Sequence, residues 1–79
     1  MTSDYYVYTD GACVNNGQEN AMAGMGIYFD DDDPRNVSKR VVGKQSNNTA
    51  ELGAIIEAYT IIKDDVENGK VVTIVSDSI

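Results

Sequence analysis

The chain has 79 residues, a formal net charge of −7 at pH 7 and no histidine. This length holds one domain at most, and the single cysteine, Cys13, excludes an internal disulfide. With no histidine and no zinc-type cysteine spacing, we expect any bound metal to be a hard cation such as Mg²⁺, Mn²⁺ or Ca²⁺, held by carboxylate oxygens. The acidic balance by itself argues against a nucleic-acid partner, because phosphate binding usually shows as a basic face.

The N-terminal residues 1–5 lack the basic region and apolar stretch of a signal peptide. No apolar run approaches the length needed to cross a membrane. These features predict an intracellular, cytoplasmic protein with no membrane partner, and no sequence feature indicates an obligate protein partner.

Residues 5–9 (YYVYT) predict the first strand, because aromatic and β-branched residues favour extended backbone. This strand runs into Asp10 and Gly11, a pair that is typical of a turn. Residues 14–20 are mostly polar and include three asparagines and Gly17, so we expect a loop there.

Two further strands are predicted in the next part of the chain. Residues 23–29 contain two glycines, which indicate a bulge or a close backbone approach. Residues 30–34, four aspartates followed by the only proline, predict a solvated surface turn. Residues 37–42 predict the third strand, which Gly43 ends.

Residues 46–51 (SNNTAE) predict the start of a helix, with Asn48 and Glu51 in a variant of the capping box. The apolar residues that follow recur at three- and four-residue spacing, which indicates one face of an amphipathic helix of about 16–18 residues. Asn68 and Gly69 are expected to end this helix. The predicted apolar face consists of Leu52, Ile55, Ile56, Tyr59, Ile62 and Val66.

Residues 71–75 (VVTIV) form a continuous apolar run and predict a buried strand. The order of three strands, a helix and a fourth strand predicts an α/β fold with a mixed sheet. Short connections between the first three strands favour an antiparallel arrangement. The helix then acts as a right-handed crossover, which makes the fourth strand parallel to the first.

This topology places three carboxylates at one edge of the sheet. Asp10 closes the first predicted strand, Asp77 closes the fourth, and Glu51 lies in the first turn of the predicted helix. If the first and fourth strands are neighbours, Asp10 and Asp77 lie roughly 5 Å apart. Three acids repel one another unless a cation lies among them, so the arrangement predicts a Mg²⁺ or Mn²⁺ site. Two such ions about 3.5–4 Å apart can activate water and stabilise the leaving oxygen of a phosphodiester.

Each carboxylate also has a plainer interpretation. Asp10 before Gly11 is compatible with a simple turn, Glu51 with a helix cap, and Asp77 with the cap of a following helix. Their convergence at one edge of the predicted sheet favours a shared metal site over three unrelated roles.

The motifs around these residues resemble ribonuclease H of the type 1 class, which is bacterial and eukaryotic nuclear. A lone TDG motif would be a weak signal, but TDG followed by NNxAEL and by a strand ending in SDS is a specific combination. The matching segments follow the family's order and spacing across nearly the whole chain: residues 8–13 (YTDGAC), 15–17 (NNG), 23–29 (AGMGIYF), 43–52 (GKQSNNTAEL) and 75–78 (VSDS).

The resemblance implies an endonuclease that hydrolyses the RNA strand of RNA–DNA hybrids with two metal ions, Mg²⁺ or alternatively Mn²⁺, leaving a 3′-hydroxyl and a 5′-phosphate. It implies Asp10, Glu51 and Asp77 as the catalytic metal ligands, with the backbone of Gly11 as a further metal contact. It also implies that the side-chain amides of Asn16, Asn47 and Asn48 line the minor groove of the hybrid. The backbone around Cys13 and Asn15 would lie near the RNA, and Lys44 and Ser46 would form a pocket for a DNA phosphate.

The resemblance also implies features that residues 1–79 do not contain. Family members carry a fourth metal-site aspartate and a mobile catalytic histidine downstream of the position that Asp77 matches, together with a fifth strand and further helices. We therefore expect residues 1–79 to form part of a ribonuclease H-like domain and to be inactive alone. The alternatives are a non-catalytic module that binds RNA–DNA hybrids, a different nuclease on the same fold, and a Ca²⁺-binding domain.

Overall fold

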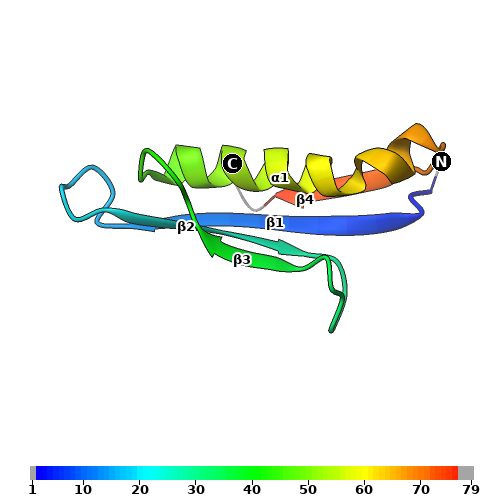
Figure 1. The fold of residues 1–79 in the computed structure, drawn as a ribbon, viewed down its shortest axis with the longest axis horizontal. Coiled ribbons are helices and arrows are strands. Elements are labelled where there is room, and N and C mark those ends of the chain that lie inside the picture. Colours follow the sequence, from blue (N-terminus) through cyan, green and yellow to red (C-terminus); the bar gives the residue numbers. More distant parts are fainter. Residues whose placement is uncertain (1, 77–79) are drawn as a thin grey trace.

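Within the described residues, a four-stranded sheet forms one layer of the molecule, and one helix packs along one of its faces (Figure 1). The computed structural model describes residues 2–76. The elements follow one another in the predicted order. They are β1 (Tyr5–Val14), β2 (Met22–Tyr28), β3 (Val37–Arg40), α1 (Asn47–Glu67) and β4 (Val72–Ser76).

The strand order across the sheet is β3-β2-β1-β4, so β1 lies between β2 and β4. β1 and β2 pair antiparallel, as do β2 and β3, whereas β1 and β4 run parallel. The predicted α/β fold with a mixed sheet is therefore confirmed. The crossover through α1 allows β4 to return parallel to β1. β2 lies within one residue of its predicted bounds, and β3 stops two residues earlier than predicted.

β1 is 10 residues long, twice the predicted length, and does not turn at Asp10 and Gly11. Asp10 pairs with Gly26, and the ladder with β2 continues to the end of the strand. The predicted turn was wrong because the cross-strand pairing with β2 outweighs the local preference of an aspartate–glycine pair. The chain turns instead at Asn15 and Gly17, whose φ angles are +55° and +84°.

The buried core lies between α1 and one face of the sheet. Alternate residues of β1 point to this face, and Val7 and Thr9 are almost fully buried there. A larger cluster fills the middle of the interface, and a smaller one lies at the start of α1, where the candidate site is expected. The larger cluster consists of Val7, Ile27, Phe29, Ala58 and Ile62. The smaller cluster consists of Ala23, Val41 and Ala50.

Small residues, rather than the large apolar ones, pack α1 against the sheet. Three alanines spaced four residues apart are fully buried, and Ile62 continues their row as predicted. The rest of the predicted face was largely wrong, because alanines let the helix lie closer to the strands than larger side chains would. The exposed fractions are 61% for Leu52, 65% for Ile56, 54% for Tyr59 and 40% for Val66.

Both ends of α1 have identifiable caps. Ser46 is the N-cap, because its Oγ accepts a hydrogen bond of 3.1 Å from the Thr49 backbone nitrogen. The predicted capping box on Asn48 was therefore wrong, and Glu51 lies in the second turn of the helix rather than the first. The predicted stop at Asn68 is confirmed. α1 is not apolar enough to cross a bilayer, so the part of the chain that the structure describes contains no candidate membrane-spanning helix.

Candidate metal centre and nucleic-acid surface

The start of α1 lies directly against β1 at Gly11. A Cβ atom on Gly11 would lie 2.5 Å from both the Ala50 carbonyl carbon and the Glu51 backbone nitrogen. Only a residue without a side chain permits this approach of helix and strand backbones. The contact therefore holds Glu51 beside the segment of β1 that contains Asp10.

Asp10 lies on the face of β1 that points away from α1. Its neighbours Thr9 and Gly11 face the helix, and side chains alternate along a strand. β4 pairs with β1 only as far as Thr9 opposite Ser76. Within residues 2–76, the pairing of β4 with β1 thus ends one residue before Asp10. The contact at Gly11 holds Asp10 and Glu51 on neighbouring chain segments, with Asp10 on the face of β1 away from the helix.

The third predicted carboxylate, Asp77, follows Ser76 in the chain and lies outside the described residues. Residues 2–76 contain no group of three side chains that could hold a metal ion. Of the three predicted carboxylate ligands, the structure describes the exposed Asp10 and the half-buried Glu51. Both are hard oxygen donors of the kind that Mg²⁺ and Mn²⁺ bind.

Two loops meet at the N-terminal end of α1. The Asn47 backbone nitrogen donates a hydrogen bond of 3.3 Å to Asn16 Oδ1, which ties the β1–β2 loop to the helix. Asn15 precedes this contact in a left-handed conformation that asparagine adopts more readily than most residues. Asn48 is the next helix residue and is exposed. Three of the predicted nucleic-acid contacts, Asn16, Asn47 and Asn48, thus form one group, which we call the asparagine patch.

Comparison with known proteins agrees with this arrangement. The family model described as RNase H matches residues 2–79. The chain belongs to the ribonuclease H family. A ribonuclease H of Schizosaccharomyces pombe is 48% identical over 61 residues, which cover 76% of this chain and 23% of that protein.

Two further relatives of the ribonuclease H family show similar identity. Ribonuclease H1 of Rattus norvegicus is 43% identical over 63 residues, which cover 80% of this chain and 22% of that protein. A ribonuclease H of Clostridium botulinum is 38% identical over 58 residues, which cover 73% of this chain and 39% of that protein. The chain thus spans well under half the length of the curated relatives that it matches.

The two residues that the ribonuclease H resemblance assigns to a phosphate pocket lie in the loop between β3 and α1. Lys44 is exposed, and no acidic side chain of residues 2–76 forms an ion pair with it. The Ser46 hydroxyl caps α1 and lies 2.8 Å from Thr49 Oγ1. Cys13 is half-buried against the smaller core cluster, and its Sγ donates to a backbone carbonyl at 3.5 Å.

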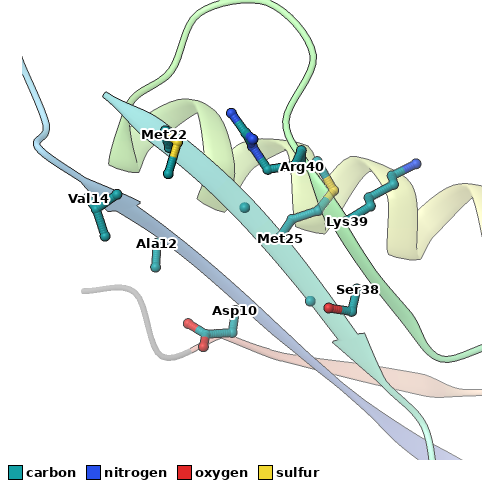
Figure 2. A pocket seen from close by; sticks show the side chains of 10 residues that line it. Asp10, Ala12, Val14, Met22, Met25, Ser38, Lys39 and Arg40 are labelled. Atoms are coloured by element: carbon teal, nitrogen blue, oxygen red, sulfur yellow. The ribbon is translucent and has the colours of Figure 1, made fainter. Parts of the chain in front are cut away.

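A hollow that the sequence analysis missed lies on the sheet face opposite α1 (Figure 2). It has a volume of about 620 Å³, and Asp10 and Arg40 are among the side chains that line it. Gly24 and Gly26 of β2 leave the strip between β1 and β3 without side chains. Their spacing of two residues was the available signal, because it places both glycines on one face of a strand.

A separate polar network lies at the other end of β1. The Arg35 guanidinium lies 4.3 Å from the centre of the Phe29 ring and 2.9 Å from Asp33 Oδ2. The hydrogen bonds that Arg35 donates to the Asp33 carboxylate hold the pKa of Asp33 below its usual range. The Tyr5 hydroxyl donates to Asp65 of α1 at 2.6 Å. This network anchors the β2–β3 turn and the C-terminal half of α1, away from the asparagine patch.

Proposed function

We propose that the protein is an endonuclease that hydrolyses the RNA strand of RNA–DNA hybrids. Membership of the ribonuclease H family supports this proposal. The observation that carries it is the contact between Gly11 and the Glu51 backbone. That contact holds together the two chain segments that bear the first two predicted metal ligands.

In this proposal Asp10, Glu51 and Asp77 bind two divalent ions, Mg²⁺ or Mn²⁺, with the backbone of Gly11 as a further contact. Asp77 is included because the ribonuclease H resemblance assigns it as the third metal carboxylate, and it follows Ser76, the partner of Thr9 in the parallel ladder. When bound, such ions activate a water molecule and stabilise the leaving oxygen of a phosphodiester. In this proposal the carboxylates hold the ions, and the exposed position of Asp10 leaves them accessible to the RNA backbone.

The asparagine patch supports an RNA–DNA hybrid as the substrate. Amide groups donate and accept hydrogen bonds, so they can bind base edges and 2′-hydroxyls across a wide, shallow minor groove. Because the Asn47 nitrogen already donates to Asn16 Oδ1, Asn16 offers its Nδ2 donor to a ligand. Lys44 is suited to a phosphate because its ammonium is exposed and has no acidic partner within residues 2–76.

For residues 1–79 taken alone, we propose hybrid binding without cleavage. They contain no histidine, and the resemblance assigns a catalytic role to one. A non-catalytic module that binds RNA–DNA hybrids on the same fold is the second candidate function. The asparagine patch favours it, because contacts from amides to a minor groove need no metal ion.

A strand-resolved cleavage assay tests the proposal. The full gene product is incubated with Mg²⁺ and a hybrid labelled on the RNA or the DNA strand. We expect cutting of the RNA strand only, and a rate at least about 100-fold lower for Asp10→Asn, because a lost metal ligand removes several kcal/mol of transition-state stabilisation. Asp64→Asn, the same change at an exposed position of α1, should cut like the wild type.

Two outcomes of this assay would overturn the proposed activity. Tight hybrid binding with no cutting would identify the non-catalytic module instead. Equal loss of both strands would indicate a nuclease with a different substrate.

A further inference from the structure

The side-chain amide of Gln45 makes three hydrogen bonds in the loop between β3 and α1. Its Oε1 accepts from the Ala23 backbone nitrogen at 2.7 Å. Its Nε2 donates to the Val41 and Gly43 carbonyl oxygens at 2.8 and 2.9 Å. One side chain therefore joins β2 to two points of the loop.

The Gln45 side chain makes the hydrogen bond to β2 that a further residue of β3 would otherwise make. β3 ends at Arg40 opposite Gly24, and the Val41 nitrogen still donates to the Ala23 carbonyl at 2.9 Å. The Ala23 N–H then has no partner on the backbone of β3, and the Gln45 amide supplies one. Ala23 and Val41 are both buried, so water does not replace this partner.

The loop that Gln45 closes carries the residues assigned to the nucleic acid. Lys44 lies inside the closed segment, after Gly43, whose φ of +96° sets the turn. Ser46 follows directly as the N-cap of α1, and Asn47 begins the helix. Fixing Gln45 against β2 therefore fixes where Lys44 and the start of the asparagine patch lie relative to the sheet.

We propose that Gln45 is a positioning residue for hybrid binding. It does not touch the nucleic acid but holds Lys44 and the start of α1 in the arrangement that binds it, and this inference rests on the proposed function. Preorganised groups bind more tightly because less freedom is lost on association. Loss of the Gln45 amide should therefore weaken hybrid binding through Lys44 and the asparagine patch.

The chain offers a matched control at the β2–β3 turn. Asn36 Oδ1 accepts from the Phe29 nitrogen at 2.7 Å, and Asn36 Nδ2 donates to the Asp30 carbonyl at 2.8 Å. Asn36 thus closes a loop with its amide as Gln45 does, but on a turn that carries no proposed nucleic-acid contact. Asn36→Leu and Gln45→Met both remove an amide while keeping a side chain of similar size.

The experiment measures the affinity of the full gene product for a fluorescent RNA–DNA hybrid in chelator, so that no cleavage occurs. We expect Gln45→Met to weaken binding about fivefold to tenfold, the cost of ordering one or two side chains on association, and Asn36→Leu to change it less than about twofold. Circular dichroism confirms that each variant is folded at the assay temperature. If Gln45→Met does not fold, Gln45→Asn, which keeps a shorter amide, is used in its place.

A double-mutant cycle with Lys44→Ala separates positioning from general destabilisation. Lys44→Ala should weaken the wild type but have little further effect in the Gln45→Met protein, because the lysine is already misplaced there. Wild-type affinity for Gln45→Met, equal weakening by Asn36→Leu, or additive effects with Lys44→Ala would overturn the inference while leaving the proposed function standing. A wild-type protein that does not bind the hybrid would overturn the proposed function itself.

Discussion

Gly11 of β1 and Glu51 of α1 are in direct backbone contact, with only 2.5 Å between the Glu51 nitrogen and the position that a Gly11 Cβ would occupy. The contact joins the middle of the central strand to the second turn of the helix. It explains why a strand rich in β-branched and aromatic residues contains a glycine at this point. It also brings the segment that carries Asp10 to the segment that carries Glu51, on which the proposed metal site depends.

Gly11→Ala should destabilise the fold, because its Cβ would overlap backbone atoms of Ala50 and Glu51 that cannot move without displacing α1. We expect a loss of about 1–3 kcal/mol in the free energy of unfolding, or more, measured by urea denaturation. The control is Gly24→Ala, where the Cβ would lie 3.6 Å from the Lys39 carbonyl oxygen, an ordinary contact. Equal stability of the two variants would show that α1 does not lie against Gly11.

Two substitutions at Ser46 separate its capping role from its proposed phosphate contact. Ser46→Ala removes the acceptor for the Thr49 nitrogen and should cost about 1 kcal/mol of stability. Ser46→Asp keeps a capping oxygen, so its stability should stay near that of the wild type. Its added negative charge should nevertheless weaken hybrid binding, measured by fluorescence anisotropy at low salt. Unchanged affinity in Ser46→Asp would place the phosphate pocket elsewhere.

The Tyr28 hydroxyl should resist deprotonation. Its hydrogen bond of 2.5 Å to Asp31, followed by desolvation, raises its pKa from 10.0 to about 12. Because the folded-state pKa lies above the unfolded one, this hydroxyl contributes stability that is present below pH 10 and is lost as the pH rises towards 12.

The titration of Tyr28 can be followed by NMR of ¹³Cζ-labelled tyrosine. In Asp31→Asn the pKa of Tyr28 should fall back towards 10.0, because the charged acceptor is gone. Asp32→Asn, the neighbouring change without a hydrogen bond to Tyr28, should leave the titration as it is in the wild type. Equal changes in the Tyr28 pKa in both variants, relative to the wild type, would contradict the hydrogen bond between Tyr28 and Asp31.

The sequence was sufficient to predict the order of elements and the parallel pairing of β1 with β4. Short connections and a single amphipathic helix leave few ways to arrange four strands, and a right-handed crossover selects among them. The motifs around Asp10 and Glu51 also indicated the family that the comparisons show. These predictions depend on chain topology and on local motifs, both of which can be read without knowing any contact.

Two details that depend on contacts between distant residues were mispredicted, and a third was not predicted at all. Asp10 and Gly11 have turn-forming side chains, but pairing with β2 keeps them in the strand. The apolar residues of α1 form two overlapping rows, and spacing alone does not tell that the row of Ala54 rather than that of Leu52 faces the sheet. Nothing in the sequence near Gln45 indicates that its amide reaches Ala23, 22 residues away.

The claim on which the function depends is that Asp10 and Glu51 bind one divalent centre. Isothermal titration of the full gene product with Mg²⁺ tests it most directly, using Asp10→Asn, Glu51→Gln and the double variant, with Asp64→Asn as the control. We expect each single variant to lose about tenfold or more in Mg²⁺ affinity, and the double variant to lose little more than either, because one site is already broken. Single variants that bind Mg²⁺ like the wild type, or losses that simply add in the double variant, would contradict a shared metal site.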